Sequence, residues 1–229
     1  MRIPTGTSGM DRLLDGGLPE SRVYVVSGPP GSGKTTFGAQ FVREGVSRKE
    51  RSLFITMHET KAELIEDMSS FNFGFEAVAT SKWMRFLHLL DSRGRETLSK
   101  FGNSETGSNA IAAMIRDLDI QRVVIDSTML LDYFLEDHDE AIVDFVTTLK
   151  KTDATVLLIS EMTDPSAYAN EHYLAHGVIF FHNFRDADGM TRAVQVIKMR
   201  GTDIDTDMRG LEFSRAGLAI YPDHVVGRA

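Results

Sequence analysis

A glycine-rich octapeptide is the strongest structural signal in the sequence. Gly28-Pro29-Pro30-Gly31-Ser32-Gly33-Lys34-Thr35 fits the pattern G-x-x-x-x-G-K-[S/T] at every fixed position. The octapeptide follows the apolar run Val23–Ser27, which we interpret as a buried strand. It precedes a helical stretch with apolar residues at Phe37, Phe41, Val42 and Val46. Strand, glycine turn and helix in this order are the context in which the pattern binds phosphate, so we predict a P-loop.

The residue types of the loop explain its chemistry. Glycines let backbone N–H groups converge on phosphate oxygens, and the following helix directs its positive end at the anion. We expect the Lys34 ammonium group to reach the β- and γ-phosphates of a nucleoside triphosphate, and the Thr35 hydroxyl to bind Mg²⁺. The predicted nucleotide site comprises Gly28, Pro29, Pro30, Gly31, Ser32, Gly33, Lys34, Thr35 and Thr36.

A triphosphate with Mg²⁺ also needs a second metal anchor on a neighbouring strand. Such an anchor is usually an aspartate at the strand's carboxyl end. Asp126 ends the apolar run Arg122–Ile125 and is followed by Ser127. We therefore predict Mg²⁺ ligation through Thr35 and Asp126.

Short apolar runs alternate with helical patterns over residues 23–160. We interpret as strands Val23–Ser27, Leu53–Met57, Arg85–Leu90, Val123–Asp126 and Val156–Ser160. Between them, Thr60 and Glu63 have the spacing of a capping box at the start of a helix. Residues 91–107 are polar and contain glycine, so we expect a loop there. Near-continuous apolar strands alternating with helices predict a mostly parallel sheet with helices on both faces.

The pattern changes after residue 177. Val178–His182 and Ala193–Met199 flank Asp186–Gly189, which has the composition of a hairpin turn. Leu211–Phe213 and Leu218–Tyr221 extend this antiparallel part. No linker rich in proline, glycine or serine divides the chain. We therefore predict an α/β fold with a C-terminal antiparallel extension, in a single domain over residues 1–229.

The composition excludes several classes of protein. Lys and Arg number 25 against 33 Asp and Glu, a net charge of −8, which disfavours nucleic-acid backbone as the main partner. The chain has no cysteine, so disulfides, zinc–thiolate sites and thiol catalysis are excluded. No apolar run reaches the length of about 18 residues that a membrane span needs. We expect a cytoplasmic protein without membrane insertion.

Six segments, one of which is the octapeptide with its flanking residue, together carry a more specific signal. They are Thr5-Gly6, the lead-in Met10–Leu18, the loop with its flank Gly28–Thr36, Phe54–Thr60, Val123–Ser127 and Lys198-Met199-Arg200-Gly201-Thr202. In these segments, which extend over nearly the whole chain, the sequence resembles the KaiC-like branch of the RecA-type P-loop ATPases. KaiC itself has two such domains in tandem, and this chain has one, like single-domain archaeal relatives.

The resemblance implies a ring or filament, most simply a homo-hexamer, with ATP bound between subunits. Lys198 and Arg200 fall on the family positions that reach from one subunit to the γ-phosphate in the next. A cation delivered in this way stabilises charge on the transferring phosphoryl group. The two residues share parity at the end of a strand, so we expect both to point to one face.

The family's catalytic glutamate position holds a histidine in this chain. Relatives place glutamate, often two in a row, after the second strand to activate the attacking water, whereas this chain has His58-Glu59. Successive side chains of a strand point to opposite faces, so His58 is the base if the strand runs straight on. If the strand end turns, Glu59 takes over. In a third alternative hydrolysis is very slow and the protein switches by binding alone.

Three functional hypotheses follow. The first is a ring-forming ATPase that uses ATP binding and hydrolysis to control assembly or the binding of a regulatory protein partner. The second is a non-hydrolysing, ATP-dependent scaffold, motivated by His58. The third is a recombination-type DNA-binding ATPase, which the acidic charge disfavours.

Two histidines have the spacing of a candidate metal site. His172 and His176 lie four residues apart, which can place two imidazoles on one face of a helix. A zinc site needs a third ligand, and no HExxH motif is present. We therefore favour a surface or subunit contact for this pair.

Overall fold

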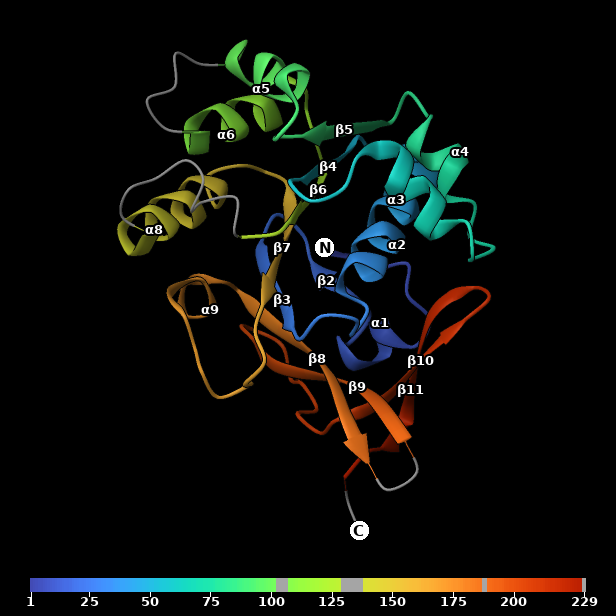
Figure 1. Ribbon diagram of the computed structural model, residues 1–229. Helices are drawn as coiled ribbons and strands as arrows, with labels where there is room; N and C mark the ends of the chain where they lie inside the picture. The colour runs from blue at the N-terminus through green and yellow to red at the C-terminus, as the bar shows by residue number, and fades with distance from the viewer. Residues whose placement is uncertain (102–106, 129–137, 187–188, 228–229) are drawn as a thin grey trace.

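The structure is a computed structural model that describes residues 1–101, 107–128, 138–186 and 189–227. Within these residues the dominant element is a nine-stranded sheet (Figure 1). Its strand order is β11-β10-β9-β8-β3-β7-β6-β4-β5. A separate two-stranded sheet near the N-terminus pairs β1 (Arg2–Ile3) with β2 (Leu18–Pro19).

Six adjacent strands of the large sheet run parallel. They are β8 (Gly177–Asp186), β3 (Val23–Gly28), β7 (Thr155–Glu161), β6 (Arg122–Asp126), β4 (Ser52–Thr56) and β5 (Met84–His88). Five of them are predicted from the sequence, whereas the sixth, over Gly177–Asp186, is expected only in the antiparallel part but pairs in parallel with Val23–Gly28. The C-terminal extension is antiparallel and comprises β9 (Gly189–Met199), β10 (Arg209–Ser214) and β11 (Gly217–Val225). The predicted α/β class with a C-terminal antiparallel part is therefore confirmed.

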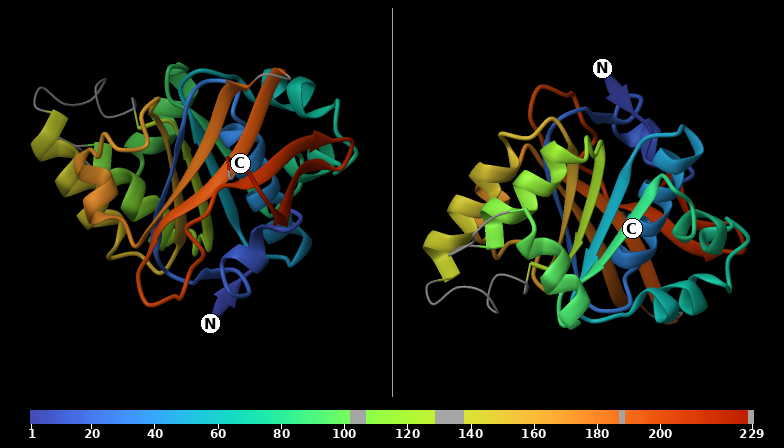
Figure 2. Two further views of the ribbon diagram at one scale, coloured as in Figure 1. Left: turned by 90° about the horizontal axis from the view of Figure 1, so that it is seen from below. Right: turned by 90° about the horizontal axis from the view of Figure 1, so that it is seen from above.

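Helices cover both faces of the sheet (Figure 2). One face packs against α2 (Lys34–Ser47), α3 (Lys61–Met68) and α4 (Phe75–Ala79). The other packs against α5 (Ser92–Ser99), α6 (Gly107–Asp117) and α8 (His138–Leu149), with the short α9 (Asn170–Leu174) beside α8. Successive residues of β3 separate into two cores, because Tyr24 and Val26 join the first and Val23 and Val25 the second. This alternation explains why the strands are apolar at nearly every position.

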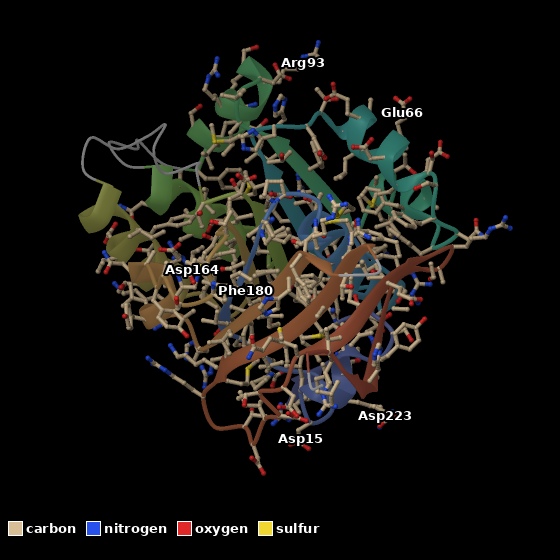
Figure 3. The ribbon with its side chains drawn as sticks, turned by 60° about the horizontal axis from the view of Figure 1, so that its bottom comes forward. Asp15, Glu66, Arg93, Asp164, Phe180 and Asp223 are labelled. Atoms are coloured by element: carbon tan, nitrogen blue, oxygen red, sulfur yellow. The ribbon has the colours of Figure 1, made fainter. Side chains whose placement is uncertain are left out.

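The lead-in to the sheet is tied to the last strand. The four-residue helix α1 (Met10–Leu13) packs against β11, and Arg12 forms an ion pair with Asp223 at 2.9 Å. Figure 3 labels Asp223, which lies close to the blue N-terminal part of the ribbon. No helix within the described residues is both long and apolar enough to span a membrane.

The prediction of a loop over residues 91–107 is wrong for much of that range. Residues Ser92–Ser99 form α5, whose N-cap is Asp91; its carboxylate accepts the N–H of Arg93 at 3.3 Å. The signal is weak because the helix is short and polar, with Gly94 and Leu98 as its buried residues. A Cβ at Gly94 would lie 1.8 Å from the carbonyl oxygen of His88, so glycine is what lets α5 pack directly on β5. Residues 102–106 lie outside the described residues.

A buried arginine joins three parts of the first core. The Arg122 side chain is fully buried, forms an ion pair with Glu50, and donates to the carbonyls of Pro4 and Phe41 at 2.7 and 3.2 Å. Its guanidinium also lies 4.7 Å from the centroid of the Phe41 ring. Arg122 thus connects the N-terminal segment, α2 and the start of β6.

We expect Arg122→Ala to lower the free energy of unfolding by about 3–5 kcal/mol, since buried carbonyls and a carboxylate lose their donor. Urea unfolding would measure the loss. Arg215→Ala, at an exposed arginine between β10 and β11, is the matched control and should change stability by less than about 0.5 kcal/mol. Equal losses in the two variants would show that Arg122 contributes no more than a surface cation.

Candidate nucleotide-binding site

The octapeptide forms the connection from β3 to α2 at the carboxyl edge of the parallel strands. Gly33 caps α2 with a φ of 108°, a left-handed conformation that favours glycine. Ser32 is fully buried, and its hydroxyl has no hydrogen-bond partner within the described part of the chain. A buried hydroxyl without a partner, beside the first turn of a helix, fits a loop that binds an anion.

Lys34 is folded over the loop. Its side chain is buried, and Nζ donates to the carbonyl oxygens of Gly28 and Pro29 at 2.7 and 2.9 Å. Burial lowers the pKa of Lys34, while the charges of Glu161 and Asp126 oppose that shift. Both contacts of the ammonium group are to neutral carbonyls, so its charge is available to a phosphate.

Thr35 and Asp126 meet at the position predicted for the metal. The Thr35 hydroxyl donates to the Asp126 carboxylate at 2.7 Å, from the start of α2 to the end of β6. Burial raises the pKa of Asp126, and the Thr35 hydrogen bond and the charges of Lys34 and His58 act in the opposite direction. Two oxygen ligands beside a phosphate loop suit Mg²⁺, which takes few protein ligands and completes its shell with phosphate and water. The described residues contain no group of three or more His, Asp or Glu that could hold a metal ion.

The strand that precedes His58 and Glu59 ends earlier than the sequence pattern indicated. β4 ends at Thr56, whose hydroxyl accepts the backbone N–H groups of His58 and Glu59 at 3.2 and 3.4 Å. The chain therefore turns before His58, which is the condition under which we expected Glu59 to face the site. His58 is exposed, whereas Glu59 is partly buried.

The environment of Glu59 places it near the metal anchor. Burial raises the pKa of Glu59, and the negative charge of Asp126 is the next cause of that shift. His58 is also close enough to act on the charge of Asp126. Of the two residues, Glu59 is the more enclosed.

Lys198 and Arg200 lie away from the loop of their own chain. The Arg200 N–H bonds the His176 carbonyl, and the His176 N–H bonds the Val23 carbonyl, at the opposite end of β3 from Gly28. The length of β3 separates these ends by about 16 Å at the usual rise of a strand. Within the described residues, the two side chains hydrogen-bond to α9 rather than to the loop. Both donate to the Tyr173 carbonyl, at 3.0 Å each, so they share one face as expected.

The antiparallel extension brings to the loop two residues that are not predicted from the sequence, Arg192 and Phe213. The Arg192 guanidinium donates to the Gly31 carbonyl at 3.3 Å and lies 5.0 Å from the centroid of the Phe213 ring. Phe213 in turn lies where a Cβ on Gly33 would contact it, at 3.2 Å. These residues had no local signal, because only the pairing of β8 to β11 places them beside the loop.

The four-residue spacing of His172 and His176 does not place the two side chains on one face of a helix. Helix α9 ends at Leu174, so the two imidazoles do not share a helical face. His172 is buried rather than on the surface, and its Nε2 lies 2.7 Å from the Ser27 hydroxyl. The pKa of His172 is lowered by burial, which favours the neutral ring. His172 therefore belongs to the interior beside β3.

Comparison with known proteins points to one family. A family model described as KaiC ATPase matches residues 3–225. The circadian clock oscillator protein KaiC of Parathermosynechococcus lividus is 29% identical over 233 residues, which cover 95% of this chain and 42% of that protein. The KaiC of Thermosynechococcus vestitus is 28% identical, with 91% and 41% covered. The chain thus spans about two fifths of the length of these curated relatives.

A solved structure resembles the chain over nearly its whole length. The crystal structure of a KaiC-like protein from the hyperthermophilic archaeon Pyrococcus horikoshii superposes with a TM-score of 0.82 at 27% identity. The match covers 97% of this chain and 99% of the archaeal one. The architecture described above, including the antiparallel extension, is therefore shared with a protein of similar length.

Proposed function

Because this chain belongs to the KaiC family of ATPases, we propose that it binds ATP with Mg²⁺ at Gly28–Thr36 and uses the bound nucleotide to control assembly or partner binding. The observation that carries the proposal is the contact between the Thr35 hydroxyl and the Asp126 carboxylate, next to Lys34. A cation, a metal ligand pair and the N-terminus of α2 then meet at one point.

Each residue of the site has a distinct task in this proposal. Lys34 exchanges its two carbonyl contacts for phosphate oxygens, and Thr35 and Asp126 hold Mg²⁺. Bound Mg²⁺ supplies positive charge that offsets the charge developing on the phosphates. Glu59 orients the attacking water, in preference to His58. The Arg192–Phe213 pair offers a flat surface for the nucleoside end of the ligand.

The positions of Lys198 and Arg200 support a ring. Their hydrogen bonds lie on α9, and the backbone of Arg200 lies at the far end of β3 from the loop, so they do not serve the site of their own chain. In a homo-oligomer, with a hexamer as the simplest case, they reach the γ-phosphate held by the neighbouring subunit. A cation supplied in this way couples the state of the nucleotide to assembly. We place this ring in the cytoplasm, together with a regulatory protein partner.

A second function, a non-hydrolysing ATP-dependent scaffold, is favoured by the histidine at position 58. ATP-driven assembly without turnover would identify it. A role in binding DNA is disfavoured by the net charge of −8.

The experiment that tests the proposal is an ATP titration by calorimetry with Mg²⁺, together with the mass in solution with and without ATP. Lys34→Ala is expected to weaken ATP binding about 100-fold or more, because a partly buried charge that contacts phosphate is lost. Lys82→Ala, at an exposed lysine beside Trp83, is the matched control and should leave the affinity unchanged. Unchanged affinity in Lys34→Ala would refute the site.

A further inference from the structure

Helix α9 contacts β3, which leads into the nucleotide loop, and the adjacent strand β7. It also contacts the two cations assigned to the neighbouring site. It lies beside β3 and β8 on the face opposite α2 (Figure 1). Its side chains Glu171 and His172 are 5% and 2% exposed, which is unusual for a charged residue and a histidine on a five-residue helix.

The side chains of α9 bond to the ends of β3 and β7. The backbone N–H of Ala169 donates to Nδ1 of His172 at 3.2 Å, so Nδ1 is an acceptor. In the neutral ring Nε2 then carries the hydrogen and donates to the Ser27 hydroxyl at 2.7 Å. Glu171 accepts from the Ser160 hydroxyl at 3.1 Å. Ser27 precedes the first residue of the loop, and Ser160 is its partner on β7.

The backbone of α9 bonds to the cations. Carbonyl groups in the last turn of a helix lack intrahelical donors and favour positive charge. Lys198 donates to the carbonyls of His172 and Tyr173 at 2.9 and 3.0 Å, and Arg200 donates to that of Tyr173 at 3.0 Å. One ammonium N–H of Lys198 and most N–H groups of Arg200 have no partner within the described residues. These groups are the ones available to a phosphate.

We propose that His172 is a positioning residue: through its bond to Ser27 it fixes α9, and α9 in turn holds Lys198 and Arg200 in the orientation that the neighbouring subunit's γ-phosphate needs. This inference rests on the proposed trans contact, in which Lys198 and Arg200 of one subunit reach the γ-phosphate held by the next. It also links the two sites of one chain, because a displacement of Ser27 at the base of the loop moves α9 and the cations together.

The test is assembly measured by sedimentation with a non-hydrolysable ATP analogue and with ADP, so that it does not depend on turnover. His172→Leu removes the donor to Ser27 and is expected to raise the protein concentration at the midpoint of assembly about tenfold with the ATP analogue. His172→Gln, which can still present an N–H to Ser27, should stay within about twofold of the unmodified chain. Ser27→Ala removes the same bond from the strand side and should reproduce the tenfold shift.

Controls separate positioning from a general loss of structure. Thr155→Val removes the partly buried hydrogen bond that the Ser21 N–H donates to the Thr155 hydroxyl at the other end of β7, and should leave the midpoint unchanged. ATP affinity of the dilute, unassembled chain should change less than about twofold in His172→Leu, because the loop itself is intact. Two outcomes would overturn the role of His172 and leave the proposed function standing. One is that His172→Leu shifts the midpoint equally with ADP and with the ATP analogue. The other is that His172→Leu causes no shift although Lys198→Ala does. An unmodified chain whose assembly ignores the γ-phosphate would overturn the trans contact and this inference with it.

Discussion

Chains carrying Arg200→Ala are expected to lose ATP turnover about a thousandfold and to recover part of it when mixed with Lys34→Ala chains. The loss follows because a cation on the transferring phosphoryl group stabilises the transition state. The recovery follows because each variant retains what the other lacks: one has an intact loop and the other intact cations. In a random 1:1 mixture about a quarter of the interfaces join a functional loop to a functional Arg200, since the interface is heterologous.

The measurement is steady-state turnover of each variant alone and of the mixture after subunit exchange. Arg85→Ala, at an exposed arginine on the amino side of the sheet in β5, is the matched control and should retain full activity alone. If the mixture is no more active than the sum of the separate variants, Arg200 acts within its own subunit. Such a result would require the side chain to leave α9 and cross the length of β3.

The order of strands and helices could be predicted because its signals are local. A run such as Val123–Ile125 is apolar at each residue, since both faces of its strand are covered. The capping box at Thr60 and Glu63 is also local, and it is confirmed: the Glu63 carboxylate accepts the Thr60 N–H at 2.7 Å. By contrast, α5 was missed because a short polar helix with a glycine resembles a loop in composition.

The same distinction holds for the site. The loop is contiguous in sequence, and Asp126 is recognisable at the end of a strand, so this half of the site could be predicted together with its position at the sheet edge. Arg192, Phe213 and His172 could not be predicted, because their proximity to the loop depends on strand pairing over more than 100 residues. The hypothesis that Glu59 rather than His58 faces the site depends on where β4 ends, and the Thr56 hydroxyl, which accepts two backbone N–H groups, marks a turn there.

Because the chain turns after Thr56, we expect substitutions of Glu59 and of His58 to have different effects on turnover. Glu59→Gln is expected to reduce turnover about 100- to 1,000-fold while ATP affinity stays the same, because the amide keeps the shape of the side chain and loses the base. His58→Ala, the matched variant at the exposed neighbour, should change turnover less than about threefold. Turnover and affinity are measured separately, by phosphate release and by calorimetry.

The pH dependence of turnover provides an independent test of whether Glu59 is the general base. A general base works when it is deprotonated, so activity falls as pH decreases through the pKa of the base. Burial and the charge of Asp126 raise the pKa of Glu59, so the acidic limb should lie above the value of about 4.3 for an ordinary glutamate. Glu59→Gln should abolish this limb in whatever activity remains. If His58→Ala removes the limb instead, the histidine is the base. If the unmodified chain binds ATP without turnover and His58→Glu restores it sharply, the protein is the nucleotide-gated scaffold of the second hypothesis.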